Sequence, residues 1–162
     1  MVWNQAKLSK SAQDFELVIP TLEHYFGGKI IKVEDTKNDV CRVLDYGCAI
    51  DGLVITDQVF GIAHRVNYCP YENFTVRFTN GGSVSEWDHI TRPGIKPRYH
   101  VQSIIQGAKV IKTAIVRTED LVQCIYEGLS ELYTNKTTGA QFVSIDWITI
   151  QSRGFTVDIL EG

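Results

Sequence analysis

Two neighbouring apolar runs contain residues that could support metal-dependent chemistry. Asp51 stands near the start of the run 50–56, and Arg65 lies in the run 59–68. A carboxylate on one strand, with a carboxylate and a cation on the next, can hold a divalent metal beside a group that orients water and a phosphate. The spacing of Asp51 and Arg65 is compatible with part of such a site.

The segment IDGLVITDQVFGIAHRV resembles the central hairpin of the PD-(D/E)XK nucleases. Asp51 matches the first acid of that family, and Ala63-His64-Arg65 stands where Glu-x-Lys is expected. Residues 11–80 carry the resemblance. It implies a restriction endonuclease-like fold, DNA as the partner and Mg²⁺ or Mn²⁺ as the cofactor.

A wider stretch resembles a family of uncharacterised proteins from bacteriophages and mobile elements. The blocks DYGCAIDGLVI, FGIAHRV, FTVRF and VIKTAIVRTEDL carry this likeness, which covers most of residues 45–125. It implies a relative of the nuclease fold in a phage or mobile-element setting, and it implies no particular activity.

The hairpin departs from the nuclease pattern at the metal ligand. Ala63 cannot bind a metal, and Arg65 cannot deprotonate water at an ordinary pH. Catalysis would therefore need an acid from elsewhere. We take Asp51, Arg65 and Glu16 as the candidate catalytic residues, with Asp51 and Glu16 as the metal ligands; the other acids that could serve are Glu23, Asp45 and Glu86.

Basic residues suggest a second role, the binding of nucleic acid. Strand alternation places Arg65 and Arg77 with Thr75 on the polar side of strands that we expect to be adjacent, where guanidinium groups suit phosphate oxygens. A basic loop with aromatic neighbours could add backbone contacts and stack a base; it comprises Arg92, Lys96, Arg98 and His100, with Tyr99 and, upstream, Trp87. A solvated sheet face and an ordinary loop are the alternatives.

Composition restricts how nucleic acid could bind. The net charge is −3 and the pI about 5.8, so any attraction must come from a local basic patch. Two functions therefore stay open. The first is a metal-dependent nuclease; the second is a non-catalytic protein that binds nucleic acid, a small ligand or a host protein as an interference factor.

The first half of the chain predicts a helix, a hairpin and a three-stranded meander. A helix should begin near Ser11 and run toward Gly27, kinked or divided at Pro20. Strands should follow at 29–34, 50–56 and 59–68, the last two paired antiparallel because their connection is short. The alternating FTVRF segment should add the third strand of the meander; short helices are expected at 86–90 and 101–106.

The second half predicts a strand at 110–117 and a helix capped by Thr118. Its apolar stripe comprises Leu121, Ile125, Leu129 and Leu132. Strands at 142–150 and 155–160 should pair with each other through a turn at 152–154. The fold class expected is α+β, one domain over 1–162, with a mixed and mostly antiparallel sheet flanked by helices.

The remaining composition describes an ordinary globular chain of 162 residues. Apolar residues make up 44% and charged residues 22%, which is typical of a chain with a packed core. The four cysteines form no CxxC pair, and no apolar run reaches the length of a membrane helix. We therefore expect a cytoplasmic protein that does not enter a membrane; the oligomeric state stays open.

Overall fold

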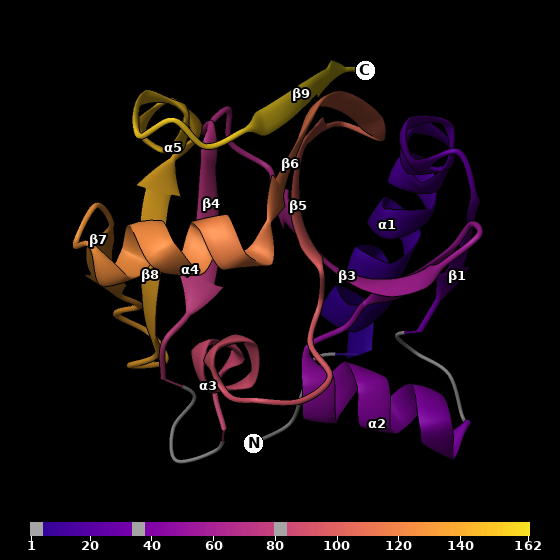
Figure 1. Ribbon diagram of the computed structural model, residues 1–162, viewed down its shortest axis with the longest axis horizontal. Helices are drawn as coiled ribbons and strands as arrows, with labels where there is room; N and C mark the ends of the chain where they lie inside the picture. The colour runs from indigo at the N-terminus through magenta and orange to yellow at the C-terminus, as the bar shows by residue number, and fades with distance from the viewer. Residues whose placement is uncertain (1–4, 34–37, 80–83) are drawn as a thin grey trace.

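The computed structural model describes residues 5–33, 38–79 and 84–162, which form two β-sheets with helices around and between them (Figure 1). The fold is α+β, and its larger sheet is mixed but mostly antiparallel, as predicted. No helix within the described ranges is long and apolar enough to cross a membrane.

Six strands form the larger sheet, sheet A, in the order β1-β2-β3-β5-β6-β9. Only β3 and β5 are parallel neighbours; the other pairs within this sheet are antiparallel. The strands are β1 (Lys29–Lys32), β2 (Gly52–Ile55), β3 (Val59–Asn67), β5 (Tyr99–Gln106), β6 (Lys109–Arg117) and β9 (Val157–Glu161).

The predicted hairpin is confirmed. β2 pairs antiparallel with β3 in a register that places Gly52 opposite Ile62 and Ile55 opposite Val59. The backbone N–H of Thr56 donates to the Gln58 carbonyl at 2.8 Å, which closes the short turn. Asp51 and Arg65 therefore belong to adjacent segments of one sheet.

Three strands form the smaller sheet, sheet B, in the order β4-β8-β7. They are β4 (Asn73–Arg77), β7 (Glu131–Thr134) and β8 (Gln141–Asp146). The predicted meander is wrong, because β4 does not pair with β3 and pairs with β8 instead. One side of β4 is polar and the other buried, which suits a sheet with one solvent-facing side.

The segment at 101–106 is also a correction, since it is strand β5 and not a helix. Its residues 100–105 are all buried, because β5 lies between β3 and β6 with helices or sheet B on its two faces. A strand covered on both faces lacks the polar–apolar alternation of a half-exposed strand, and here the buried residues include the polar His100, Gln102 and Ser103. This is why its pattern was mistaken for that of a helix.

Five helices occur in the described residues, and three of them differ from the prediction. They are α1 (Gln5–Phe26), α2 (Asp39–Cys48), α3 (Glu86–Thr91), α4 (Thr118–Tyr126) and α5 (Trp147–Ser152). α2 was not predicted. α4 ends before Leu129, and Arg117 occupies its N-cap without a side-chain cap bond. α5 replaces part of a predicted strand, so β8 and β9 belong to different sheets and do not pair.

Pro20 lies within α1 and does not divide it. The missing N–H would have bonded to the carbonyl of Glu16 one turn earlier. Both residues are on the exposed side of the helix, where water can satisfy that carbonyl. The predicted end of the helix is confirmed by Gly27, whose φ of 67° is left-handed.

Two apolar cores lie on the two faces of sheet A. Phe15, Val18 and Leu22 of α1 pack on one face with Val54 and Ile62. On the other face a second core joins sheet A to α4, α5 and sheet B, and Trp147 is its largest fully buried side chain. Figure 1 shows α1 on one side of sheet A and sheet B on the other. Residues that alternate along β3 therefore face different layers.

Candidate functional site

Arg65 ends in an ion pair between sheet A and α3. Its Nη2 lies 2.8 Å from Oε2 of Glu86, the first residue of α3. The backbone N–H of Arg77 donates to the same oxygen at 3.0 Å. The structure thus brings Arg65 and Arg77 to one carboxylate, although they are not on adjacent strands.

His100 completes this cluster from β5. Its register partner on β3 is Ala63, so it stands beside the position where the nuclease pattern has an acid. Its Nε2 is 3.5 Å from Oε1 of Glu86, too long for a strong hydrogen bond. Its Nδ1 lies 3.1 Å from the Thr118 hydroxyl. We refer to Arg65, Glu86 and His100 as the ion-pair cluster.

The electrostatics of the cluster favour a charged Glu86. Burial alone would raise the pKa of this carboxyl, whose side chain is 5% exposed. The charge of Arg65, the neighbouring His100 and the N–H of Arg77 outweigh burial and hold the pKa well below its usual range. Glu86 is therefore ionised at neutral pH, and its Oε2 oxygen accepts from Arg65 and from the Arg77 backbone.

Asp45 is the second carboxyl close to Arg65, and it comes from α2. Burial raises its pKa, and the charge of Arg65 offsets part of that rise. Sequence reasoning named Glu86 and Asp45 among the substitute acids. The structure places both near the arginine that follows Ala63.

His64 points away from Arg65, as strand alternation predicts. Its ring stacks on Phe15 of α1 with centroids 4.7 Å apart, and its Nε2 is 3.0 Å from the Ser103 hydroxyl. Burial and then the charge of Arg65 lower its pKa to about 3. The imidazole is therefore neutral and belongs to the core.

Asp51 lies beside β3, immediately before β2. Its backbone N–H donates to the Ile62 carbonyl at 2.9 Å, and its Oδ2 accepts the backbone N–H of His64 at 2.6 Å. The carboxylate is therefore held against the part of β3 that contains Ala63. The neighbouring Gly52 faces the other way, since an added Cβ there would lie 2.9 Å from the Phe15 ring.

Glu16 lies on α1, and its carboxylate forms an ion pair with Lys32. Its Oε1 lies 2.7 Å from Nζ of Lys32, and the side chain is 62% exposed. Lys32 pairs with Gly52 in the register of β1 and β2. Glu16 is thus anchored on the side of sheet A that α1 covers.

The residues described do not fit the Mg²⁺ or Mn²⁺ site that the nuclease resemblance implies. Such ions take several oxygen ligands. Ala63 supplies none, Glu86 is bound by Arg65, and Glu16 is bound by Lys32. Within residues 5–33, 38–79 and 84–162, no group of three or more His, Cys, Asp or Glu side chains could hold a metal ion.

The basic loop after α3 does not form one patch. Arg92 donates to the carbonyl of Gly47 at 2.6 Å and so ties the loop to α2. Lys96 lines a hollow beside α4. Arg98 donates to Oε1 of Gln58 at 3.0 Å, next to the turn of the hairpin. The three side chains therefore contact different parts of the protein and do not form a continuous basic surface.

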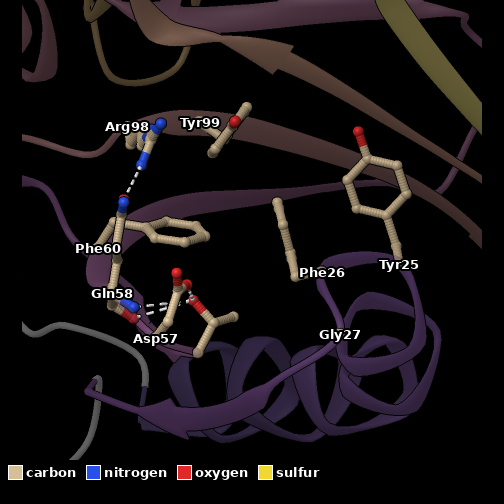
Figure 2. A pocket seen from close by; sticks show the side chains of 9 residues that line it. Tyr25, Phe26, Gly27, Asp57, Gln58, Phe60, Arg98 and Tyr99 are labelled. Atoms are coloured by element: carbon tan, nitrogen blue, oxygen red, sulfur yellow. Dashed lines mark hydrogen bonds between the residues drawn. The ribbon is translucent and has the colours of Figure 1, made fainter.

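Arg98 lies at an open hollow of about 620 Å³, shown in Figure 2. The end of α1, the β2–β3 turn and the start of β5 meet there. The rings of Phe26, Phe60 and Tyr99 lie together, with centroids 5.3 to 5.6 Å apart. The Arg98 guanidinium is 5.2 Å from the Phe60 centroid and 5.8 Å from that of Tyr99. We call this site the aromatic hollow.

Sequence reasoning found Arg98 and Tyr99 but missed the rest of the aromatic hollow. Phe26 is the last residue of α1 and Phe60 is the second residue of β3, and nothing in their local pattern links them to the loop. Trp87, expected beside that loop, instead stacks on Phe78 with centroids 4.9 Å apart. The signal that could have found the site is the Gly27 stop, which brings the end of α1 to the hairpin turn.

Comparisons of the chain with protein-family models, curated proteins and solved structures give no match.

Proposed function

We propose that the protein binds nucleic acid through the aromatic hollow, as a non-catalytic relative of the restriction endonuclease-like nucleases from a phage or mobile element. One observation carries this proposal. The Arg98 guanidinium lies over Phe60 and Tyr99 at the edge of an open hollow. Aromatic faces that stack bases, next to a cation that contacts the backbone, are what single-stranded nucleic acid requires.

The dimensions and charges of the hollow suit one nucleotide. Its volume of about 620 Å³ lies within the range of small-molecule sites. Arg98 is held by Gln58, so less side-chain freedom is lost when it meets a phosphate. Asp57, which also lines the hollow, supplies an acceptor for an exocyclic amino group. An unpaired base can enter such a hollow, whereas a base within a duplex cannot.

The ion-pair cluster supports a binding role over catalysis. Of the substitute acids, Glu86 pairs with Arg65, two residues after Ala63, and Arg65 and the Arg77 N–H already occupy one of its oxygens. Recruiting Glu86 to a metal would compete with its ion pair to the partly exposed Arg65, and loss of that pair would be costly for the buried carboxylate. In this proposal Asp51 and Arg65 keep the hairpin of a nuclease, and the cluster stabilises the fold.

The proposal is tested by fluorescence anisotropy with labelled single-stranded and duplex oligonucleotides over a range of salt concentrations. Wild type should bind single strands more tightly than duplexes. Tyr99→Leu should weaken binding by about 5- to 150-fold, the loss of one stacked base. Arg98→Ala should reduce the slope of log K against log salt by about 0.7. Lys109→Ala removes an exposed charge at the far end of β5 and β6 and should change neither quantity.

Two outcomes would overturn the proposal. If wild type binds no oligonucleotide at low salt, where screening is weakest, a host protein or a small ligand becomes the favoured partner. If the protein cleaves DNA with Mn²⁺, and Asp51→Asn abolishes cleavage, the protein is a nuclease despite Ala63. Circular dichroism of each variant confirms that it is folded.

A further inference from the structure

A second hollow, also of about 620 Å³, lies over sheet B and is separate from the aromatic hollow. All three strands of sheet B line it, together with Asn67 at the end of β3 and Thr149 of α5. No lysine or arginine is among its lining residues. We call it the sheet B hollow.

A chain of hydrogen bonds runs along one wall of this hollow. Nδ2 of Asn67 donates to Oδ1 of Asn73 at 2.9 Å, and Nδ2 of Asn73 donates to the Ser144 hydroxyl at 2.8 Å. Ser144 therefore accepts one bond and keeps its own proton to donate. Thr75 pairs with Ser144 in the strand register and adds a second hydroxyl on the same face. The wall offers both donors and acceptors.

Asp146 supplies a strong acceptor at the end of β8. It occupies the N-cap of α5, where an aspartate commonly accepts a backbone N–H, yet its side chain makes no cap bond. Asp146 is among the residues that line the hollow, and none of the side-chain hydrogen bonds among the described residues uses its carboxylate. Glu131 is a second acid in the lining, and it accepts the hydroxyl proton of Tyr133.

Aromatic rings form the apolar part of the lining. Tyr133 and Phe142 are cross-strand partners whose rings stack, with centroids 5.5 Å apart and planes 17° apart. Tyr133 is 44% exposed and Tyr71, from the loop before β4, is 65% exposed. These rings can cover the apolar face of a ligand.

The charges decide which class of ligand fits. The two carboxylates repel an anion, so phosphate-bearing ligands are disfavoured. Arg77 is not among the lining residues, and of the two carboxylates Glu131 already accepts from Tyr133, so Asp146 is left to accept from hydroxyl donors. We propose that the sheet B hollow binds a neutral carbohydrate. A sugar ring has hydroxyls that both donate and accept, which matches Asn73, Ser144 and Asp146, and an apolar C–H face, which matches the aromatic rings.

The experiment is a titration monitored by amide NMR with glucose, galactose, mannose, N-acetylglucosamine and ribose. At least one sugar should shift the amide signals of β4, β7 and β8 in a saturable way. Asp146→Asn should weaken that binding by about tenfold or more, because hydrogen bonds to a charged group are the stronger ones. Asp57→Asn removes an acid from the aromatic hollow and is the matched control. It should leave sugar binding unchanged.

Three results would overturn the proposal. They are no saturable shift with any of the five sugars, shifts confined to other elements, or equal affinity in wild type and Asp146→Asn. The side chain of Asp146 makes no bond that the fold needs, so the variant should fold as wild type does. Tyr99→Leu should weaken oligonucleotide binding and leave sugar binding unchanged, so failure of this proposal is distinguishable from failure of the nucleic-acid proposal.

Discussion

At the scale of single residues, Glu86 limits what Arg65 can do. The guanidinium that would face a phosphate in a nuclease is held at 2.8 Å by a buried carboxylate. Desolvating that carboxylate is costly, and the charge of Arg65 compensates for it. The pair is therefore a structural unit, and removing either partner takes away an opposite charge that lies 2.8 Å from the other.

Replacing Glu86 with glutamine should show this dependence. Glu86→Gln keeps the shape and removes the charge, so Arg65 loses the carboxylate that lies 2.8 Å from its Nη2. We expect the free energy of unfolding to fall by about 2–4 kcal/mol, below the full value for a buried pair because Arg65 is partly exposed. Urea unfolding followed by tryptophan fluorescence measures it. Glu72→Gln, which breaks an exposed pair with Lys112, is the control; an equal effect in both would contradict the prediction.

The sequence predicts only part of the ion-pair cluster, and there is a physical reason why the rest could not be predicted. Asp51 and Arg65 could be placed on neighbouring segments because only a short turn separates their strands. Glu86 appeared among several candidate acids, but nothing local distinguished it from Glu16 or Glu23. Its role depends on side-chain contacts with Arg65 of β3 and His100 of β5, which join elements that are separate in the sequence. Arg77 reached the cluster through its backbone N–H, which no side-chain pattern reveals.

At the scale of elements, the strand pairings predicted wrongly involve strands whose actual partners lie far away in the sequence. β4 follows β3 in the chain, so a meander was expected, but β5 takes the place beside β3 as a parallel strand. A parallel neighbour needs a crossover, here through β4 and α3, and local patterns do not reveal it. α2 was missed because none of its residues is buried.

Gly28 tests the contact that forms the aromatic hollow. It connects α1 to β1, and an added Cβ would lie 2.4 Å from the Ile55 carbonyl oxygen and 2.6 Å from a Thr56 methyl. We expect Gly28→Ala to destabilise the protein by about 1–3 kcal/mol, because a backbone atom must move. It should also weaken oligonucleotide binding, since Thr56 lines the hollow. Thermal unfolding and anisotropy measure the two effects.

Gly27 provides the comparison for that variant. Its φ is left-handed, but nothing lies within 4 Å of an added Cβ. Asparagine tolerates this conformation, so Gly27→Asn should change stability and binding less than Gly28→Ala does. A larger effect at Gly27 would show that conformation, and not the close approach to β2, is the important property of this connection.

At the scale of the whole molecule, His64 makes stability depend on pH. Its folded pKa is about 3, against 6.5 for an ordinary histidine. As pH falls below 6.5, His64 binds a proton in the unfolded chain but stays neutral in the folded protein. The free energy of unfolding therefore decreases. We expect a loss of about 2 kcal/mol between pH 6.5 and 4.5. Below that range the depressed pKa of Glu86 adds a second loss.

Urea unfolding at a series of pH values measures the effect of His64. His64→Gln should flatten the dependence between pH 6.5 and 4.5, because the titrating group is gone. His24→Gln replaces an exposed histidine at the end of α1 and should leave the dependence as in wild type. An unchanged slope in His64→Gln would show that other groups cause the loss.

The pairing of β4 with β8 has a consequence for synthesis on the ribosome. The Asn73–Ser144 contact joins positions 71 residues apart. At the usual elongation rate of about 5–20 residues per second, β4 has no partner strand for roughly 4 to 14 seconds after it is made. Phe74 and Val76, buried in the finished protein, are unprotected during that interval. The nascent chain thus exposes an apolar, unpaired strand until β8 has been synthesised. A chaperone or another nascent chain can bind it during that time.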